Sequence, residues 1–143
     1  MANVNVRYTA SALSTGEGRN GHVRSSDGLL DLDLAAPTEM GGPGGATNPE
    51  QLFAAGYAAC FHSALKGVAG RKKLALGPST VAADVGIGPR DEGGFGLTVA
   101  LRVEIAGLDE AAADKLVAAA HQMCPYSNAT RGNIDVAIDT KVT

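Results

Sequence analysis

The segment 50–69 constrains the fold of this chain more than any other part. Drawn as a helix, it is apolar on almost every side, and a helix of that kind is buried rather than laid on a surface. Asn48 suits the N-cap position, Pro49 the first helical position, and Gln51 the third position of a capping box. The sequence therefore predicts a buried central helix. Its large apolar residues are Leu52, Phe53, Tyr57, Phe61, Leu65 and Val68.

Apolar residues that alternate along the chain predict strands on both sides of this helix. The expected strands lie at 4–8, 22–24, 30–34, 81–87, 95–105 and 134–138, with a hairpin connection at 90–94. A second helix is expected from its cap, Asp109, to about Met123, with Leu116, Ala120 and Met123 facing inward and Pro125 enforcing its end. The order βββ-α-ββ-α-β predicts an α+β fold, with mainly antiparallel sheets around two buried helices.

Composition narrows the classes of partner. The chain has 143 residues, a length typical of one domain, so we expect a single domain over 1–143. Its net charge of −3 and its 4% of aromatic residues argue against nucleic acid as a partner. Charged residues make up only 19%, which favours an apolar surface covered in an oligomer.

The beginning of the sequence bears on location. No basic segment followed by an apolar one stands at the start, and no run approaches the ~20 apolar residues of a membrane span. We therefore expect neither a signal peptide nor a membrane partner. Two cysteines in such a chain predict a reducing compartment, and we expect the protein in the cytoplasm.

The two cysteines, Cys60 and Cys124, are the main candidates for chemistry. They could be inert core residues, a structural disulfide, metal ligands or a redox pair. Cys60 and His62 are two residues apart on a helix and point in roughly opposite directions. They cannot reach one metal ion together with His121 and Cys124, so we expect no metal site. His62 is expected to be a packed or hydrogen-bonded core histidine.

A redox role for Cys60 requires its thiolate. Burial raises a thiol pKa, and the dipole of its own helix cannot help, because Cys60 stands 12 residues after Asn48. A cation must therefore come from elsewhere in the fold, and an arginine is the best candidate because it keeps its proton. Spacing alone does not select among Arg7, Arg19, Arg24, Arg71, Arg90, Arg102 and Arg131.

Two long motifs carry a family resemblance. The run 48–61, NPEQLFAAGYAACF, resembles the first-cysteine motif of the organic hydroperoxide resistance (Ohr) proteins, and 124–133, CPYSNATRGN, resembles their second. Gly93-Gly94-Phe95-Gly96-Leu97 and Ser25-Ser26-Asp27-Gly28, with Gly18-Arg19 before it, also fit. The related osmotically inducible protein C branch shares the fold and the two cysteines, but its second motif differs after Cys-Pro. The resemblance covers essentially the whole chain as one Ohr-like domain.

The resemblance implies a thiol-dependent peroxidase of organic hydroperoxides, alkyl or lipid, in oxidative-stress defence. By position, Cys60 would be the peroxidatic cysteine and Cys124 the resolving one, with a sulfenic acid and then a disulfide between them. Arg19 and Glu50 would be the polar partners of the thiolate. Phe95 and Tyr126 are candidate substrate contacts. No bound cofactor is implied; an external dithiol, such as lipoyl groups of dehydrogenase complexes, would be the reductant.

The spacing of Glu50 and Cys60 predicts an assembly. Ten residues along one helix separate them by about 15 Å. For both to share a site, either the helix breaks or Glu50 comes from a second chain, so we expect an intertwined homodimer with composite sites. Three other functions stay open: a broader peroxidase that also uses hydrogen peroxide, a non-catalytic redox sensor, and a binding module for hydrophobic ligands.

Overall fold

The chain forms two compact units, Met1–Pro49 and Glu50–Thr143. The computed structural model describes residues 3–143. The single domain expected over 1–143 stays a prediction. Within the described residues, no helix combines the length and the hydrophobicity that a bilayer crossing requires.

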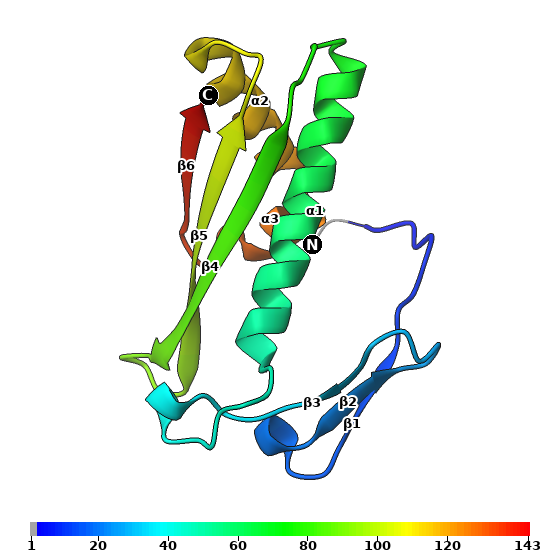
Figure 1. Ribbon diagram of the computed structural model, residues 1–143, viewed down its shortest axis with the longest axis vertical. Helices are drawn as coiled ribbons and strands as arrows, with labels where there is room; N and C mark the ends of the chain where they lie inside the picture. Colours follow the sequence, from blue (N-terminus) through cyan, green and yellow to red (C-terminus); the bar gives the residue numbers. More distant parts are fainter. Residues whose placement is uncertain (1–2) are drawn as a thin grey trace. The chain divides into compact units, whose positions relative to one another are not determined.

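The first unit is built on a three-stranded antiparallel sheet in the order β1-β2-β3, drawn in blue in Figure 1. The strands are β1 (Ala12–Thr15), β2 (His22–Ser25) and β3 (Asp31–Asp33). A 3-10 turn, η1 (Gly18–Asn20), connects the first two strands, and a second, η2 (Thr38–Met40), follows β3. The strands expected at 22–24 and 30–34 are confirmed.

The strand expected at 4–8 is wrong. Residues 3–11 are not in a strand, and β1 begins only at Ala12. Val4, Val6 and Tyr8 are 79%, 65% and 79% exposed. Alternation gives a stable strand only when a neighbouring strand supplies cross-strand partners, and within residues 3–143 no strand pairs with this segment.

The second unit contains a three-stranded sheet in the order β4-β5-β6. Its long hairpin joins β4 (Ser79–Pro89) to β5 (Phe95–Ile105), and the turn at 90–94 is closed by the Arg90 N–H, which donates to the Gly94 carbonyl. The last strand, β6 (Val136–Val142), runs parallel to β5. A parallel neighbour needs a crossover connection, and here two helices provide it.

The helices of this unit are α1 (Pro49–Arg71), α2 (Glu110–Met123) and α3 (Pro125–Thr130). The start of α1 at Pro49 and the cap of α2 are confirmed, since Asp109 accepts from the Ala112 N–H. The six-residue α3 was not expected. Pro125 ends α2 as expected, but it also occupies the first position of α3, where its missing N–H costs nothing.

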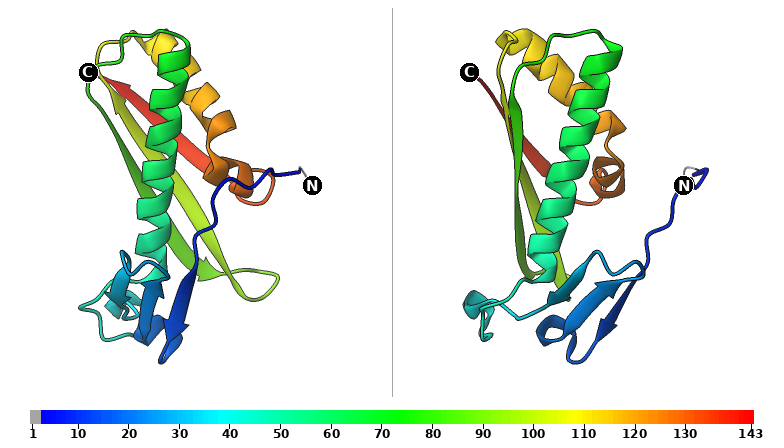
Figure 2. Two further views of the ribbon diagram at one scale, coloured as in Figure 1. Left: turned by 90° about the vertical axis from the view of Figure 1, so that its right-hand side faces the viewer. Right: turned by 45° about the vertical axis from the view of Figure 1, so that its right-hand side comes forward.

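Both long helices cover the same face of the sheet (Figure 2). One stripe of α1 is buried there, formed by Tyr57, Phe61, Leu65 and Val68. The opposite side of α1 carries small residues, among them Ala55, Ala59 and Ser63, which are exposed in this single chain. The expected burial of α1 on every side is thus met on one side only, because the sheet and α2 contact that side alone.

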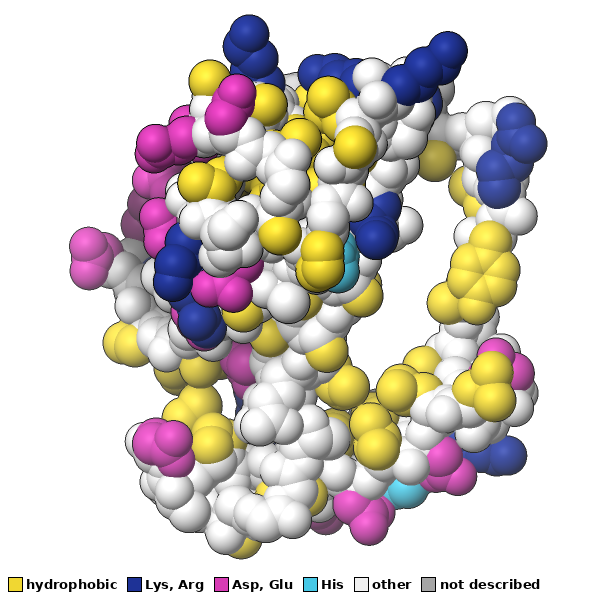
Figure 3. Space-filling model, turned by 45° about the horizontal axis from the view of Figure 1, so that its top comes forward, with side chains coloured by type: hydrophobic (Ala, Val, Ile, Leu, Met, Phe, Trp, Pro, Cys, Tyr) yellow, Lys and Arg dark blue, Asp and Glu magenta, His cyan; other side chains and the backbone are white. Residues whose placement is uncertain are grey.

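Apolar side chains also remain at the surface of both units, drawn in yellow in Figure 3. In the second unit Met123 is 49% exposed, so its expected inward position is wrong; it is the last residue of α2, where the helix leaves the core. The other large exposed apolar residues are Val4, Val6, Tyr8, Leu13, Leu29, Leu30, Met40, Phe95 and Tyr126.

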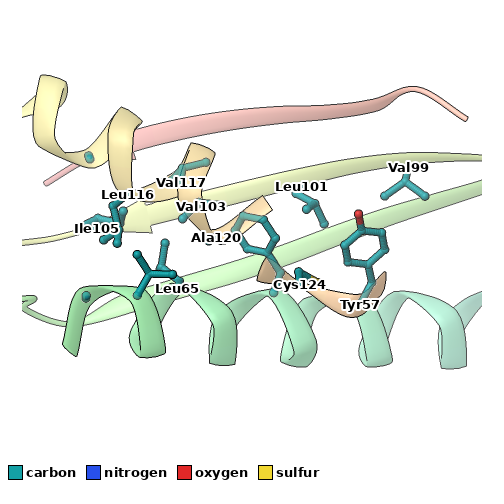
Figure 4. Packing of buried hydrophobic residues seen from close by; sticks show 14 residues of the cluster. Tyr57, Leu65, Val99, Leu101, Val103, Ile105, Leu116, Val117, Ala120 and Cys124 are labelled. Atoms are coloured by element: carbon teal, nitrogen blue, oxygen red, sulfur yellow. The ribbon is translucent and has the colours of Figure 1, made fainter. Parts of the chain in front are cut away.

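The core lies between the sheet and the two helices (Figure 4). Alternate residues of β5 point into it, namely Val99, Leu101, Val103 and Ile105. From α2 come Ala113, Leu116, Val117 and Ala120, and the cluster ends at Cys124. The predicted α+β class with mainly antiparallel sheets is confirmed, and each of the two long helices buries one side against the sheet.

Candidate active site

The two cysteine sulfurs meet in the second unit. Cys60 lies in the middle of α1, and Cys124 is the single residue between α2 and α3. Both are free thiols; Cys124 is fully buried and Cys60 is partly buried. Their Sγ atoms are 3.6 Å apart, with the Cys124 S–H donating to Cys60. Packing of α1 and α2 on one sheet face brings together residues 64 positions apart.

A backbone group also reaches Cys60. The Tyr126 N–H belongs to the first turn of α3, where backbone N–H groups have no acceptor within their own helix. It donates to the Cys60 thiol instead. Sequence reasoning missed this donor, although Pro125 directly after Cys124 was a usable signal that a helix starts there.

The Cys60 thiol is not activated by its own surroundings in this unit. Burial raises its pKa most strongly, and the neighbouring Cys124 sulfur adds to the rise, whereas the Tyr126 N–H lowers the pKa. A thiol with a raised pKa is largely protonated at neutral pH. A nucleophilic Cys60 therefore needs a further stabilising charge, as the sequence argument required.

Aromatic side chains lie next to the cysteine pair. The Tyr126 ring contacts Tyr57 and Phe53, with ring centroids 5.7 Å and 6.1 Å apart. Gly56 makes this approach possible, because a Cβ there would lie 2.9 Å from the Tyr126 hydroxyl oxygen. Tyr126 remains 40% exposed.

A buried hydroxyl network holds α3 against α1. The Tyr57 hydroxyl is 2.7 Å from Ser127 Oγ and 3.2 Å from Thr130 Oγ1. Ser127 Oγ is also 2.8 Å from His121 Nδ1 on α2. Arg131 then connects α3 to α2: it donates to Asn128 Oδ1 of α3 at 2.7 Å and to the His121 carbonyl of α2 at 2.6 Å. Sequence reasoning missed this network, which no local pattern encodes.

Of the four candidate residues besides the cysteines, Tyr126 is described above, and the other three lie in three different elements. Arg19 lies in the 3-10 turn η1 of the first unit. Glu50 lies in the first turn of α1, and the helix continues unbroken to Cys60. Phe95 is the first residue of β5, opposite Pro89, and is 67% exposed.

The histidines of this unit are engaged in hydrogen bonds. His62 Nε2 is 2.9 Å from Ser79 Oγ, which confirms the expected hydrogen-bonded role. Burial lowers the pKa of His121, and Arg131 lowers it further. Among residues 3–143, no group of three His, Cys, Asp or Glu side chains could hold a metal ion.

Comparison with known proteins now decides the family. The model of the OsmC-like proteins matches residues 42–139. An organic hydroperoxide resistance protein of Xanthomonas axonopodis pv. citri is 57% identical over 135 residues, covering 93% of this chain and 94% of the relative. The chain belongs to the organic hydroperoxide resistance proteins of the OsmC-like family. The resemblance stated from its two cysteine motifs is confirmed.

Solved structures of the family have the same fold. A crystal structure of an organic hydroperoxide resistance protein from Legionella pneumophila matches with a TM-score of 0.93 at 54% identity, over 96% of this chain and all of that one. That of OhrB from Bacillus subtilis matches with a TM-score of 0.86 at 45% identity, over 95% of this chain and all of that one. Both crystal structures therefore share the fold of this chain over nearly its whole length.

Proposed function

We propose that this protein is a two-cysteine, thiol-dependent peroxidase that reduces alkyl or lipid hydroperoxides to alcohols in oxidative-stress defence. The observation that carries the proposal is the 3.6 Å approach of the Cys60 and Cys124 sulfurs. Membership of the organic hydroperoxide resistance proteins supports the class of substrate.

The first step is attack on the peroxide. The Cys60 thiolate attacks one oxygen of R–O–O–H, the O–O bond breaks, and the departing alkoxide takes up a proton to leave as the alcohol. Cys60 becomes a sulfenic acid. Cys60 suits this role because it is the less buried residue of the pair. The Tyr126 N–H that lowers the pKa of Cys60 would also stabilise its thiolate.

The second step closes a disulfide. The Cys124 thiol condenses with the Cys60 sulfenic acid, forming a sulfur–sulfur bond and releasing water. An external dithiol then reduces this bond by thiol–disulfide exchange and is itself oxidised to a disulfide. Lipoyl groups are the reductant we propose, in the cytoplasm, and no bound cofactor takes part.

Arg19 and Glu50 are assigned to the charge balance of the thiolate. The guanidinium of Arg19 would lower the pKa of Cys60 and stabilise the departing alkoxide. The Glu50 carboxylate would hold the guanidinium of Arg19 in position through paired hydrogen bonds. Because α1 is unbroken from Glu50 to Cys60, about 15 Å separates them along one helix. This separation favours a homodimer in which Glu50 of one chain serves Cys60 of the other.

Tyr126 and Phe95 are the proposed substrate contacts. The Tyr126 N–H donates to Cys60, the residue is 40% exposed, and its ring contacts Phe53. An apolar, aromatic entrance favours an alkyl chain over hydrogen peroxide, since only the alkyl chain gains from leaving water. Phe95, exposed at the hairpin end of β5, would add a second apolar contact.

The test is peroxide turnover with dihydrolipoamide as reductant, comparing cumene hydroperoxide with hydrogen peroxide. Cys60→Ser is the inactive control. We expect fast turnover that depends on Cys60 and prefers cumene hydroperoxide. Equal use of hydrogen peroxide would point to a broader peroxidase of the osmotically inducible type. A single oxidation without turnover would point to a redox sensor, and no reaction at all to a binding module.

A further inference from the structure

One buried hydrogen bond joins α1, which carries Cys60, to α3, which begins directly after Cys124. Tyr57 stands three residues before Cys60 on α1, and Ser127 stands three residues after Cys124 on α3. The Tyr57 hydroxyl and Ser127 Oγ are 2.7 Å apart, and both side chains are fully buried. The bond therefore crosses the same contact between elements as the 3.6 Å approach of the two sulfurs.

The short helix α3 needs contacts of this kind with its neighbours to keep its position. Six residues are too few for a helix to be stable in isolation. Thr130 strengthens the attachment: its Oγ1 is 3.2 Å from the Tyr57 hydroxyl and donates to the Ser127 carbonyl at 3.1 Å. Loss of one hydroxyl would leave its buried partner short of a hydrogen bond. Removing the bond should therefore loosen α3 on α1.

We propose that the Tyr57–Ser127 hydrogen bond is a positioning tie that keeps Cys124 within reach of the oxidised Cys60. The inference rests on the proposed peroxidase function and assigns the tie to its second step. Tyr57 and Ser127 would act through the placement of Cys124 and would not themselves touch the peroxide.

Two reactions compete for the Cys60 sulfenic acid. Condensation with the Cys124 thiol forms the disulfide and releases water. Alternatively, the sulfenic acid attacks a second hydroperoxide, which is reduced to its alcohol while the sulfur becomes a sulfinic acid. The first reaction needs Cys124 in place, whereas the second needs only peroxide. Loosening α3 should thus shift the products from disulfide to sulfinic acid.

The experiment measures this partition in Tyr57→Phe and Ser127→Ala. Tyr57→Phe keeps the ring that packs against Phe53 and Tyr126 and removes only the hydroxyl. Reduced protein is mixed with increasing cumene hydroperoxide, and intact mass separates disulfide from sulfinic acid. Stopped-flow measurement gives the rate of the first oxidation. The matched control is Ser79→Ala, which removes a different hydroxyl bonded to α1, at His62.

We expect the first oxidation to slow by at most a few-fold, less than the partition shifts, because the Cys60 side chain is unchanged and only its Tyr126 N–H donor moves with α3. The ratio of disulfide to sulfinic acid should fall roughly tenfold in both variants, the scale of losing one buried hydrogen bond. Ser79→Ala should partition like the wild type.

Tyr57→Phe also removes the bond to Thr130, and Ser127→Ala also removes the bond to His121. The double variant Tyr57→Phe/Ser127→Ala should therefore shift the ratio by less than the product of the two single shifts, because the two changes have one bond in common.

The positioning role would be refuted if Tyr57→Phe and Ser127→Ala gave the wild-type ratio of disulfide to sulfinic acid while circular dichroism showed both variants to be folded. An equal shift in Ser79→Ala would refute it as well, since the effect would then be general loosening. If Ser127→Ala fails to fold, Tyr57→Phe decides alone, as the milder change. A wild-type protein that forms neither product would instead refute the proposed peroxidase, and this separates the two failures.

Discussion

The reactivity proposed for Cys60 depends on the protonation of one sulfur atom. Burial raises the pKa of the thiol, Cys124 adds to the rise, and the Tyr126 N–H offsets part of it. The thiolate is the attacking species, so an added positive charge should have a large effect at this position. Arg19 is the residue assigned to supply it.

Replacing Arg19 by alanine should therefore raise the pKa of Cys60 by about one unit or more. The rate at which iodoacetamide alkylates Cys60 would then fall roughly tenfold at neutral pH and rise only at more alkaline pH. The measurement uses a Cys124→Ser background, so that one thiol is followed. Arg24→Ala is the control from the same unit, since Arg24 Nε faces Asp31 at 3.7 Å. An unshifted profile in Arg19→Ala would rule out this role for Arg19.

Among the elements, the pair β2–β3 carries a pH-dependent contact. His22 on β2 bonds Asp33 through Nδ1 at 2.7 Å and Asp31 through Nε2. The hydrogen bond with Asp33, and then that with Asp31, raises the pKa of His22 above 6.5. Protonated His22 thus stabilises the strand pair. This contribution is complete below pH 6.5 and is lost as the pH rises through the raised pKa.

His22→Asn should remove that pH dependence. We expect the variant to unfold at a lower temperature than the wild type at about pH 5.5, and the difference to shrink towards about pH 8.5, as the pH rises through the raised pKa of His22. Thermal unfolding followed by circular dichroism at both pH values checks this. A difference that is constant with pH, or that grows as the pH rises, would contradict it.

Two glycines of α1 provide a matched pair. A Cβ at Gly56 would press on the Tyr126 ring and hydroxyl, whereas a Cβ at Gly67 would meet nothing within 4 Å. Gly56→Ala should lower the free energy of unfolding by about 1–3 kcal/mol through overpacking. Gly67→Ala should raise it by up to about 1 kcal/mol, because alanine favours the helix. Urea unfolding compares them, and equal effects would show that the Tyr126 contact is not tight.

Local signals predicted most of these elements. The Asn48-Pro49 start of α1, the Asp109 cap of α2 and the unbroken alternation of β5 are all encoded within a few residues, and all are observed. The strand expected at 4–8 failed because alternation cannot reveal whether a pairing strand exists. The parallel pairing of β6 with β5 could not be predicted either, because it is a contact between segments that are distant in the sequence.

The candidate site was also predictable only in part. Cys60 and Cys124 stood out through their motifs, since each motif is a continuous run of residues. The groups that surround them did not, because the Tyr126 N–H and the Tyr57–Ser127 bond arise only when α3 packs on α1. The six residues of α3 are too short to show a helical period.

For the whole molecule, a single chain leaves much apolar surface uncovered. The outer side of α1 is exposed at Ala55 and Ala59, and Tyr8 and Leu29 of the first unit are 79% and 90% exposed. Apolar surface on this scale is typical of a chain that associates with another. It agrees with the low proportion of charged residues and with the homodimer proposed from the Glu50 spacing.

Mixed dimers test the composite site directly. Cys60→Ser and Glu50→Ala are each expected to be strongly impaired. After subunit exchange in equal amounts, half of the dimers would be mixed and each would hold one intact site, giving about a quarter of wild-type turnover. The control mixes Cys60→Ser with Cys124→Ser, which should recover nothing because both sulfurs come from one chain. If the mixture of Cys60→Ser with Glu50→Ala recovers no activity once subunit exchange is confirmed, Glu50 does not act in the partner's site.

The 64 residues that separate the two sulfurs along the chain link the stability of the fold to the strength of their bond. A covalent bond across a loop of this length would restrict the unfolded chain by about 4 kcal/mol in the chain-entropy model. Thermodynamic linkage makes this stabilisation reciprocal. Reduction of the disulfide is therefore less favourable in the native fold than in the unfolded chain, by the same free energy. A dithiol acting on the native protein must overcome this difference, and partial unfolding would make the oxidised protein easier to recycle.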